Sequence, residues 1–213
     1  MNIIDTPDNT TGQIIHLQAD KVTDVIRYLT TARGSSKLVT ATEARALGAA
    51  GIRLGLVFEV YGGADGVNDI DAADGTIDAQ FCLDYLPTIG APMDGTVCVY
   101  FACDTDFSRA DIQSKVLPYF AAIKKTFAEN PVLAGVYGSG AVCRAVCSAG
   151  SAKYAWLSGS MGWTNSKAYL AARPRELVLV QDEMDTRLAN MDVDTNYALG
   201  PFGSFLPFGE TVA

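Results

Sequence analysis

The sequence has little charge and few of the residues that most metal and nucleophile sites require. Charged residues make up 19% of the 213 positions, against about 25% in an average globular protein, and His16 is the only histidine. No CxxC, HExxH or GxSxG motif is present, which argues against zinc sites and against the serine hydrolases that carry a nucleophile elbow. A catalytic triad would have to use His16, which we expect on the first helix as a surface or core residue.

Long apolar runs and basic clusters are also missing. Apolar stretches extend over only a few residues, whereas a membrane-spanning helix needs about 20. Residues 1–5 have no basic region and no apolar core, so no signal peptide is predicted. Sixteen Lys and Arg against 24 Asp and Glu give a net charge of −8, which argues against nucleic acid and anionic membranes as partners. The sequence does not indicate an oligomeric state.

The apolar content is high enough for a folded core. Hydrophobic residues make up 49% of the chain, so disorder is excluded, and the length suits a single domain over residues 1–213. Five cysteines are spread along the chain without metal or redox spacing, and we interpret them as buried thiols: Cys82, Cys98, Cys103, Cys143 and Cys147.

Short apolar, β-rich runs alternate with helical patterns. The predicted strands are residues 3–6, 25–29, 53–60, 96–102, 132–137, 152–157, 176–181 and 191–197. Predicted helical segments are residues 40–50, 76–86, 108–127, 141–149 and 166–172. Thr40 and Glu43 form a capping box at the start of one helix, and Ser108 with Asp111 forms a cap at another.

This alternation predicts parallel strands joined by right-handed crossovers. Eight units favour a compact α/β fold, a single (β/α)8 TIM-type barrel. An open doubly wound sheet is the alternative, but it normally has a glycine-rich turn after the first strand, and residues 5–9 contain no glycine.

Acidic and aromatic residues stand at the ends of these strands, where barrel enzymes place their chemistry. A group of carboxyls beside aromatic rings is typical of a carbohydrate site, in which one carboxylic acid donates a proton and a second carboxylate stabilises the anomeric carbon. The predicted catalytic residues are Glu59, Asp104, Asp106 and Asp5. The predicted substrate-binding residues are Arg27, Tyr28, Tyr100, Tyr137, Trp156, Gln181 and Asp194. No cofactor is predicted.

Several of these residues have structural alternatives. Asp106 could cap the following helix, and Asp5 could fix its own loop. Tyr137 and Trp156 could be core residues. Arg27 would need an acidic partner inside or beside the barrel, and it would then orient neighbouring side chains and not act as a catalyst. A divalent cation held by Asp104, Asp106 and Asp194 is a minor alternative.

The sequence resembles the glycoside-hydrolase-like domains of unknown function related to the family 25 lysozymes, the N-acetylmuramidases. The resemblance spans nearly the whole chain and rests on residues 4–6 (IDT), 25–28 (VIRY), 37–47 (KLVTATEARAL), 51–54 (GIRL), 57–59 (VFE) and 99–106 (VYFACDTD). It implies a barrel with an acidic cleft that faces glycans of a bacterial cell wall, and a secreted or wall-associated protein. The lysozymes carry Asp-x-Glu after the fourth strand, where this chain has Asp104-Thr105-Asp106.

Two functions follow from this resemblance. The first is a glycoside hydrolase acting on peptidoglycan or a related polysaccharide, with Glu59 or Asp106 as the acid and Asp104 as its partner. The second is a barrel that binds glycan without cleaving it. Asp5 matches the first-strand aspartate of the family and Asp194 resembles its last-strand aspartate.

Overall fold

Eight strands close into a barrel in the computed structural model, which describes residues 2–32, 34–60, 62, 66–67 and 70–209. Seven strands run parallel and pair in chain order: β1 (Ile3–Asp5), β2 (Asp24–Leu29), β3 (Arg53–Phe58), β4 (Cys98–Ala102), β5 (Leu133–Gly138), β6 (Tyr154–Leu157) and β7 (Leu177–Gln181). The strand β9 (Met191–Ala198) lies between β7 and β1 and completes the ring. The predicted TIM-type barrel is confirmed.

The last barrel strand departs from the expected parallel pattern. β9 runs antiparallel to both β1 and β7, and a short strand, β8 (Thr186–Leu188), pairs with it as an outer hairpin that was not predicted. The reason is the length of the connection, because residues 182–190 are too few for the helical crossover of about a dozen residues that joins parallel strands. As a result, the first half of β9 lies at the barrel edge where the parallel strands end.

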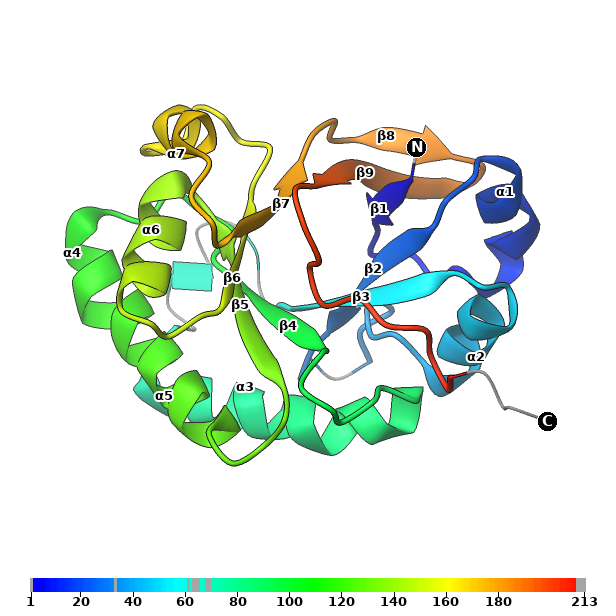
Figure 1. Ribbon diagram of the computed structural model, residues 1–213, viewed down its shortest axis with the longest axis horizontal. Helices are drawn as coiled ribbons and strands as arrows, with labels where there is room; N and C mark the ends of the chain where they lie inside the picture. The colour runs from blue at the N-terminus through cyan, green and yellow to red at the C-terminus, as the bar shows by residue number, and fades with distance from the viewer. Residues whose placement is uncertain (1, 33, 61, 63–65, 68–69, 210–213) are drawn as a thin grey trace.

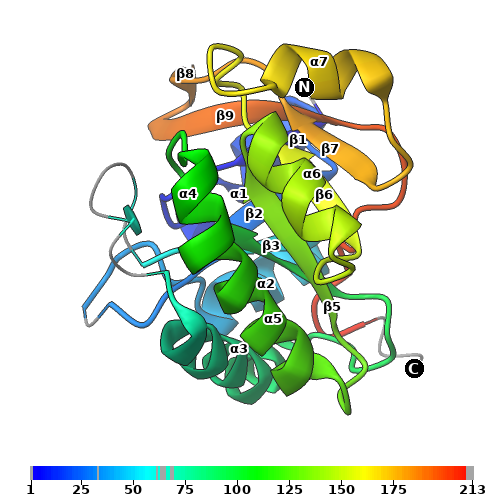
Figure 2. The same ribbon diagram turned by 90° about the vertical axis from the view of Figure 1, so that its left-hand side faces the viewer.

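The helices surround the barrel (Figure 1). They are α1 (Ile14–Ala19), α2 (Ala41–Ala49), α3 (Ala72–Tyr85), α4 (Arg109–Asp111), α5 (Leu117–Phe127), α6 (Gly140–Ser148) and α7 (Ser166–Ala172). Short 3-10 turns cover Thr11–Gln13 and Leu86–Ile89, and a π-helical stretch over Ile112–Val116 joins α4 to α5. Helices α3 and α5 pack side by side outside the strands (Figure 2).

Side-chain caps fix where the helices begin. Thr40 accepts a hydrogen bond from the Glu43 backbone N–H at 3.1 Å, and Ser108 accepts one from the Asp111 N–H at 3.1 Å, as predicted. Helix α3 begins earlier than expected because the Asp71 carboxylate accepts bonds from the backbone N–H groups of Ala73 and Asp74. These caps satisfy N–H groups that have no partner within their helix.

Large aromatic side chains fill the barrel interior. The Tyr100 and Trp156 rings meet edge to face with centroids 5.8 Å apart, and both side chains are buried. Gly135 on β5 leaves room for this filling, because a Cβ there would lie 2.5 Å from Tyr100 Cδ1. The segment after β9 closes the amino end of the barrel, where Tyr100 OH donates to the Phe202 carbonyl at 2.9 Å.

The cysteines are free thiols, and all except the half-buried Cys147 are buried. Burial raises the pKa of Cys147 to about 12, so its thiolate is scarce at neutral pH. Within the described part of the chain, none of the helices combines the length and apolar character needed to cross a bilayer.

Candidate functional site

A pocket of about 170 Å³ opens where the parallel barrel strands end. Its walls are formed by Asp5, Tyr28, Val57, Glu59, Ala102, Asp104, Tyr137, Trp156, Ser160, Gln181, Met184 and Asp194. A larger open groove of about 670 Å³ lies at the amino end of β5, beside Lys124 and Lys153, and none of the predicted site residues lines it. The chemistry-bearing residues therefore converge on the smaller pocket.

The strand order explains the convergence. Asp5 and Gln181 are the last residues of β1 and β7, and Glu59 directly follows β3. Asp194 joins them because β9 is antiparallel, which pairs Asp194 with Asp5 in the register of β1 and β9. Residues from opposite ends of the sequence thus meet at one edge of the barrel.

Glu59 and Asp104 face the same small space. A Cβ at Gly62 would lie 2.9 Å from Asp104 Oδ2 and 3.4 Å from Glu59 Oε1. The Glu59 and Asp104 carboxylates therefore approach the same point at the mouth of the pocket.

A cation stands next to this pair. Lys37 Nζ lies 2.7 Å from Glu59 Oε2 and 5.0 Å from the centroid of the Tyr28 ring. The Lys37 side chain is 40% exposed, whereas Glu59 is buried, so the ion pair joins a buried carboxylate to a cation that solvent reaches. Lys37 is therefore the positively charged partner of Glu59 at the pocket.

Asp5 lies deeper, in a network of hydrogen bonds. Its Oδ2 accepts from Asn196 Nδ2 at 2.7 Å and from Gln181 Nε2 at 3.4 Å, and Gln181 Nε2 also donates to Asp194 Oδ2 at 2.7 Å. Burial raises the pKa of Asp5 from 3.8 to about 8; the hydrogen bond from Asn196 opposes this shift and the charge of Asp194 adds to it. Burial also raises the pKa of Asp194. The pocket thus holds one carboxyl, Asp5, that keeps its proton at neutral pH.

Aromatic rings form one wall. Tyr137 and Trp156 pack with centroids 4.7 Å apart, and the Tyr137 hydroxyl lies 3.0 Å from Gln181 Oε1. Trp156 is 1% exposed, so it provides the floor of the pocket more than an open stacking platform. Tyr28 and the exposed side chain of Met184 stand nearer to solvent.

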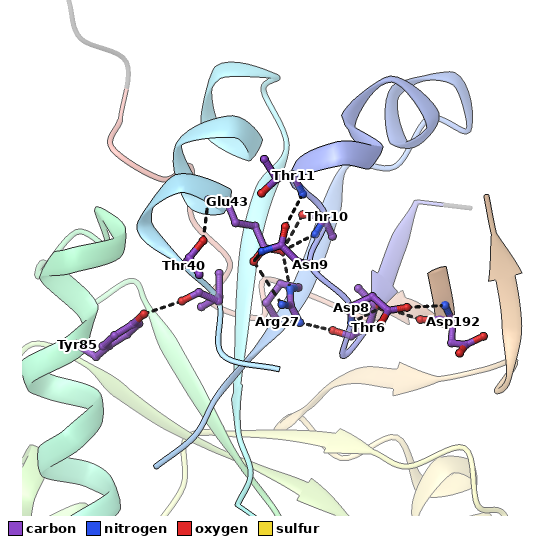
Figure 3. Close-up of polar contacts among 11 residues, drawn as sticks. Thr6, Asp8, Asn9, Thr10, Thr11, Arg27, Thr40, Glu43, Tyr85 and Asp192 are labelled. Carbon is purple, nitrogen blue, oxygen red and sulfur yellow. Dashed lines mark hydrogen bonds and ion pairs between the residues drawn. The ribbon is translucent and has the colours of Figure 1, made fainter. Parts of the chain in front are cut away.

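The remaining predicted residues lie outside the pocket lining. Tyr100 sits below it, with its hydroxyl directed to the other end of the barrel. Asp106 accepts hydrogen bonds from the backbone N–H and the hydroxyl of Thr164, both at 2.9 Å. Arg27 has the acidic partner that the sequence required, because Nε donates to Glu43 Oε1 at 2.7 Å in a fully buried ion pair (Figure 3).

Six residues of the site were not predicted from the sequence: Lys37, Val57, Ala102, Ser160, Met184 and Asn196. Asn196 holds Asp5, Lys37 pairs with Glu59, and Met184 flanks the opening. The two-residue period of a strand would have found Asn196, because it lies on the same face of β9 as Asp194. Lys37 lies in a loop and Met184 between β7 and β8, where no periodic signal exists. Among the described residues, no group of three or more His, Cys, Asp or Glu side chains is placed to hold a metal ion.

A closed eight-stranded barrel with an acidic, aromatic-lined pocket at the carboxyl ends of its strands defines the chain as a glycoside-hydrolase-like barrel. The chain belongs to the family described as "Rv2525c-like, glycoside hydrolase-like domain", whose model matches residues 16–198. The predicted resemblance is confirmed.

Two curated relatives come from Bacillus subtilis strain 168. The chain is 28% identical to the uncharacterized protein FadG over 149 residues, which cover 67% of this chain and 25% of FadG. It is 30% identical to the uncharacterized protein YbfG over 103 residues, which cover 45% of this chain and 14% of YbfG. The chain therefore spans a quarter or less of the length of either relative.

Solved structures share the fold. The Mycobacterium tuberculosis Tat-secreted protein Rv2525c has a TM-score of 0.79 at 20% identity, over 95% of this chain and 97% of that one. A bacterial lysozyme from Streptomyces coelicolor has a TM-score of 0.56 at 12% identity, over 94% of this chain and 93% of that one. A family 25 glycosyl hydrolase from Bacillus anthracis has a TM-score of 0.54 at 11% identity, over 92% and 88%.

Proposed function

We propose that the chain is a glycoside hydrolase that cleaves bacterial peptidoglycan or a related cell-wall polysaccharide through paired carboxylates. One observation carries the proposal: Glu59 and Asp104 direct carboxylate oxygens into the same small space of a pocket walled by Tyr137 and Trp156. Hydrolysis of a glycosidic bond needs a proton donor for the leaving oxygen and a carboxylate at the anomeric carbon, and in this proposal Glu59 and Asp104 supply the second.

In this proposal Glu59 and Asp104 act at the anomeric carbon. Glu59 is ion-paired with Lys37 at 2.7 Å, and in this proposal its carboxylate stabilises the positive charge of the anomeric carbon. Asp106, which occupies the position of the lysozyme acid in the sequence motif, has its carboxylate engaged by Thr164. The proton donor in this proposal is therefore neither Glu59 nor Asp106.

The test is an assay of purified wall preparations for new reducing ends. Wild type is expected to release them, and Glu59→Gln and Asp104→Asn are expected to lose about 10²-fold or more in turnover. Asp106→Asn is the matched control, because it removes a carboxylate that lies outside the pocket lining. Equal activity of Glu59→Gln, Asp104→Asn and wild type would contradict the proposal.

A second candidate is a module that binds wall glycan without cleaving it. The engagement of Asp106 by Thr164 favours it, since the lysozymes have a glutamate at this motif position and an aspartate is one methylene shorter. Under this function, wild type sediments with insoluble wall material but releases no reducing ends from any preparation. Glu59→Gln would then change the affinity alone.

A further inference from the structure

A glycosidase needs a group that protonates the departing oxygen, and the proposed function leaves that role open. Asp5 is the carboxyl that remains in the pocket beside Asp194. It ends β1, is 3% exposed, and pairs in the barrel with Ile26 on one side and Asp194 on the other. Among the described residues, no Lys, Arg or His forms an ion pair with it.

The orientation of two amide side chains around Asp5 is fixed by their other contacts. Trp156 Nε1 only donates, and it donates to Asn196 Oδ1 at 2.9 Å, so the Asn196 amide nitrogen must face Asp5. The backbone N–H of Gly159 donates to Gln181 Oε1 at 3.0 Å, so the Gln181 amide nitrogen must face Asp5 and Asp194.

Both amide nitrogens donate a hydrogen bond to the same oxygen of Asp5. Oδ2 accepts from Asn196 at 2.7 Å and from Gln181 at 3.4 Å, so a proton bound by this carboxyl resides on Oδ1. The titratable groups that face Asp5 are Asp194 of β9, Glu59 after β3, Tyr28 of β2 and Tyr137 of β5. None of these is a cation, and burial raises the pKa of Asp5 to about 8, so the carboxyl is protonated at neutral pH.

We propose that Asp5 is the proton donor of the hydrolysis, that its proton is held on Oδ1, and that Asn196 and Gln181 are the positioning residues that keep it there. This inference rests on the proposed function. Oδ1 gives its proton to the glycosidic oxygen while the bond from that oxygen to the anomeric carbon breaks, and the electron pair of the bond stays on the oxygen. The Asp104 or Glu59 carboxylate stabilises the positive carbon. Water then adds its hydroxyl group to this carbon, and the proton of the water returns to Asp5.

A comparison of two substrates tests the role of Asp5. Wall glycan has a poor leaving group that must be protonated, whereas a nitrophenyl glycoside of an N-acetylglucosamine oligosaccharide releases a leaving group that needs no proton. Asp5→Asn is expected to lose about 10²-fold or more in turnover of wall glycan and to keep its rate of first nitrophenol release within a few-fold, because that bond breaks before Asp5 accepts the proton of the water. Asp104→Asn is expected to lose activity on both substrates, because the Asp104 carboxylate stabilises the anomeric carbon whichever group leaves.

The control for Asp5→Asn is Asp24→Asn, which alters a buried carboxyl at the amino end of the neighbouring strand β2. Full activity of Asp5→Asn on wall glycan, with wild type active, would overturn the inference and leave the proposed function standing. An equal loss on both substrates would also overturn it. Wild type that cleaves neither substrate would overturn the proposed function, and with it this inference.

Carboxyl-¹³C titration by NMR gives a readout that does not depend on turnover. Wild type should show a carboxyl that titrates near pH 8 and is missing from Asp5→Asn. Asn196→Ala should move this titration to higher pH, because the hydrogen bond from Asn196 lowers the pKa of Asp5. An Asp5 signal that titrates near pH 4 would overturn the inference, and an unchanged titration in Asn196→Ala would remove the positioning role of Asn196.

Discussion

Arg27 and Glu43 form an ion pair that is completely shielded from solvent. Arg27 Nε and Nη2 donate to the two Glu43 oxygens at 2.7 and 3.3 Å, and both side chains have 0% exposure. Arg27 Nη1 also donates to the carbonyl of Thr6 at 2.6 Å, next to Asp5 in the sequence. Glu43 Oε1 accepts from the Thr10 N–H and hydroxyl as well, so the pair ties β2, α2 and the loop after β1 together (Figure 3).

Breaking this pair is expected to destabilise the fold. Arg27→Met leaves a buried carboxylate without its cation, which costs about 3–5 kcal/mol in the free energy of unfolding. Denaturant titration measures this cost. The exposed pair of Arg187 and Asp192 is the control, and Arg187→Ala should cost less than about 1 kcal/mol. The double variant Arg27→Met/Glu43→Leu should recover part of the lost stability, because it removes the unpaired carboxylate but leaves the buried Thr10 N–H and hydroxyl without their acceptor. A double variant no more stable than Arg27→Met would contradict this explanation.

Protonation of Asp5 should make stability depend on pH. The folded chain keeps this proton up to about pH 8, whereas an unfolded aspartate releases it near 3.8, so unfolding between these values releases a proton. The contribution of Asp5 is therefore fully present below about pH 4 and is lost as pH rises to about 8. At about 1.4 kcal/mol per pKa unit, the loss amounts to several kcal/mol. Urea unfolding of wild type and Asp5→Asn across this range measures it.

The difference between these two proteins isolates Asp5 from other titrating groups. The free energy of unfolding of wild type should fall relative to Asp5→Asn as pH rises. A difference that stays constant between pH 4 and 8 would show that Asp5 titrates alike in the folded and unfolded chains.

A methyl group at Gly62 should disturb the carboxylate pair and spare the fold. The added Cβ would lie 2.9 Å from Asp104 Oδ2, so the Asp104 side chain must shift by a few tenths of an ångström. Displacement of a reacting group by about 1 Å can cost about 10²-fold, so Gly62→Ala is expected to lose several-fold in turnover. Because Gly62 is exposed, the melting temperature should not change. Gly12→Ala is the control, since a Cβ there meets no atom within 4 Å. Equal turnover of Gly62→Ala and Gly12→Ala would argue against a catalytic role of the Glu59 and Asp104 carboxylates.

The cap at Thr40 should contribute measurably to stability. Its hydroxyl accepts from the Glu43 N–H at 3.1 Å, and removal of such a cap costs about 0.5–2 kcal/mol. We therefore expect Thr40→Ala to lower the free energy of unfolding by this amount in denaturant titrations. Thr76→Ala serves as the comparison, because that hydroxyl only bonds back to the Ala72 carbonyl within α3, and its loss should be neutral or slightly stabilising. A similar cost for both variants would mean that the cap is not the cause.

Local features of the fold were predictable from the sequence. Each predicted strand corresponds to a barrel strand, and the Thr40 and Ser108 caps begin helices as expected. The residues at the ends of the predicted strands also include most of those that line the pocket, among them Asp5, Glu59 and Asp104. These features depend on the order of neighbouring residues, because apolar runs, caps and strand ends are determined within a few positions of the chain.

Only the tertiary structure decided the properties that depend on distant contacts. β9 closes the barrel between β7 and β1, and its antiparallel pairing with β1 brings Asp194 and Asn196 to Asp5. Asn196 and Asp5 are separated by 191 positions, so no local pattern links them. The protonation of Asp5 and the pairing of Glu59 with Lys37 likewise follow from burial and neighbours that the fold supplies. The sequence determined which side chains are available at the barrel edge, and the tertiary structure determined that Asp5 keeps its proton there, because protonation depends on solvation and on groups far away in the chain.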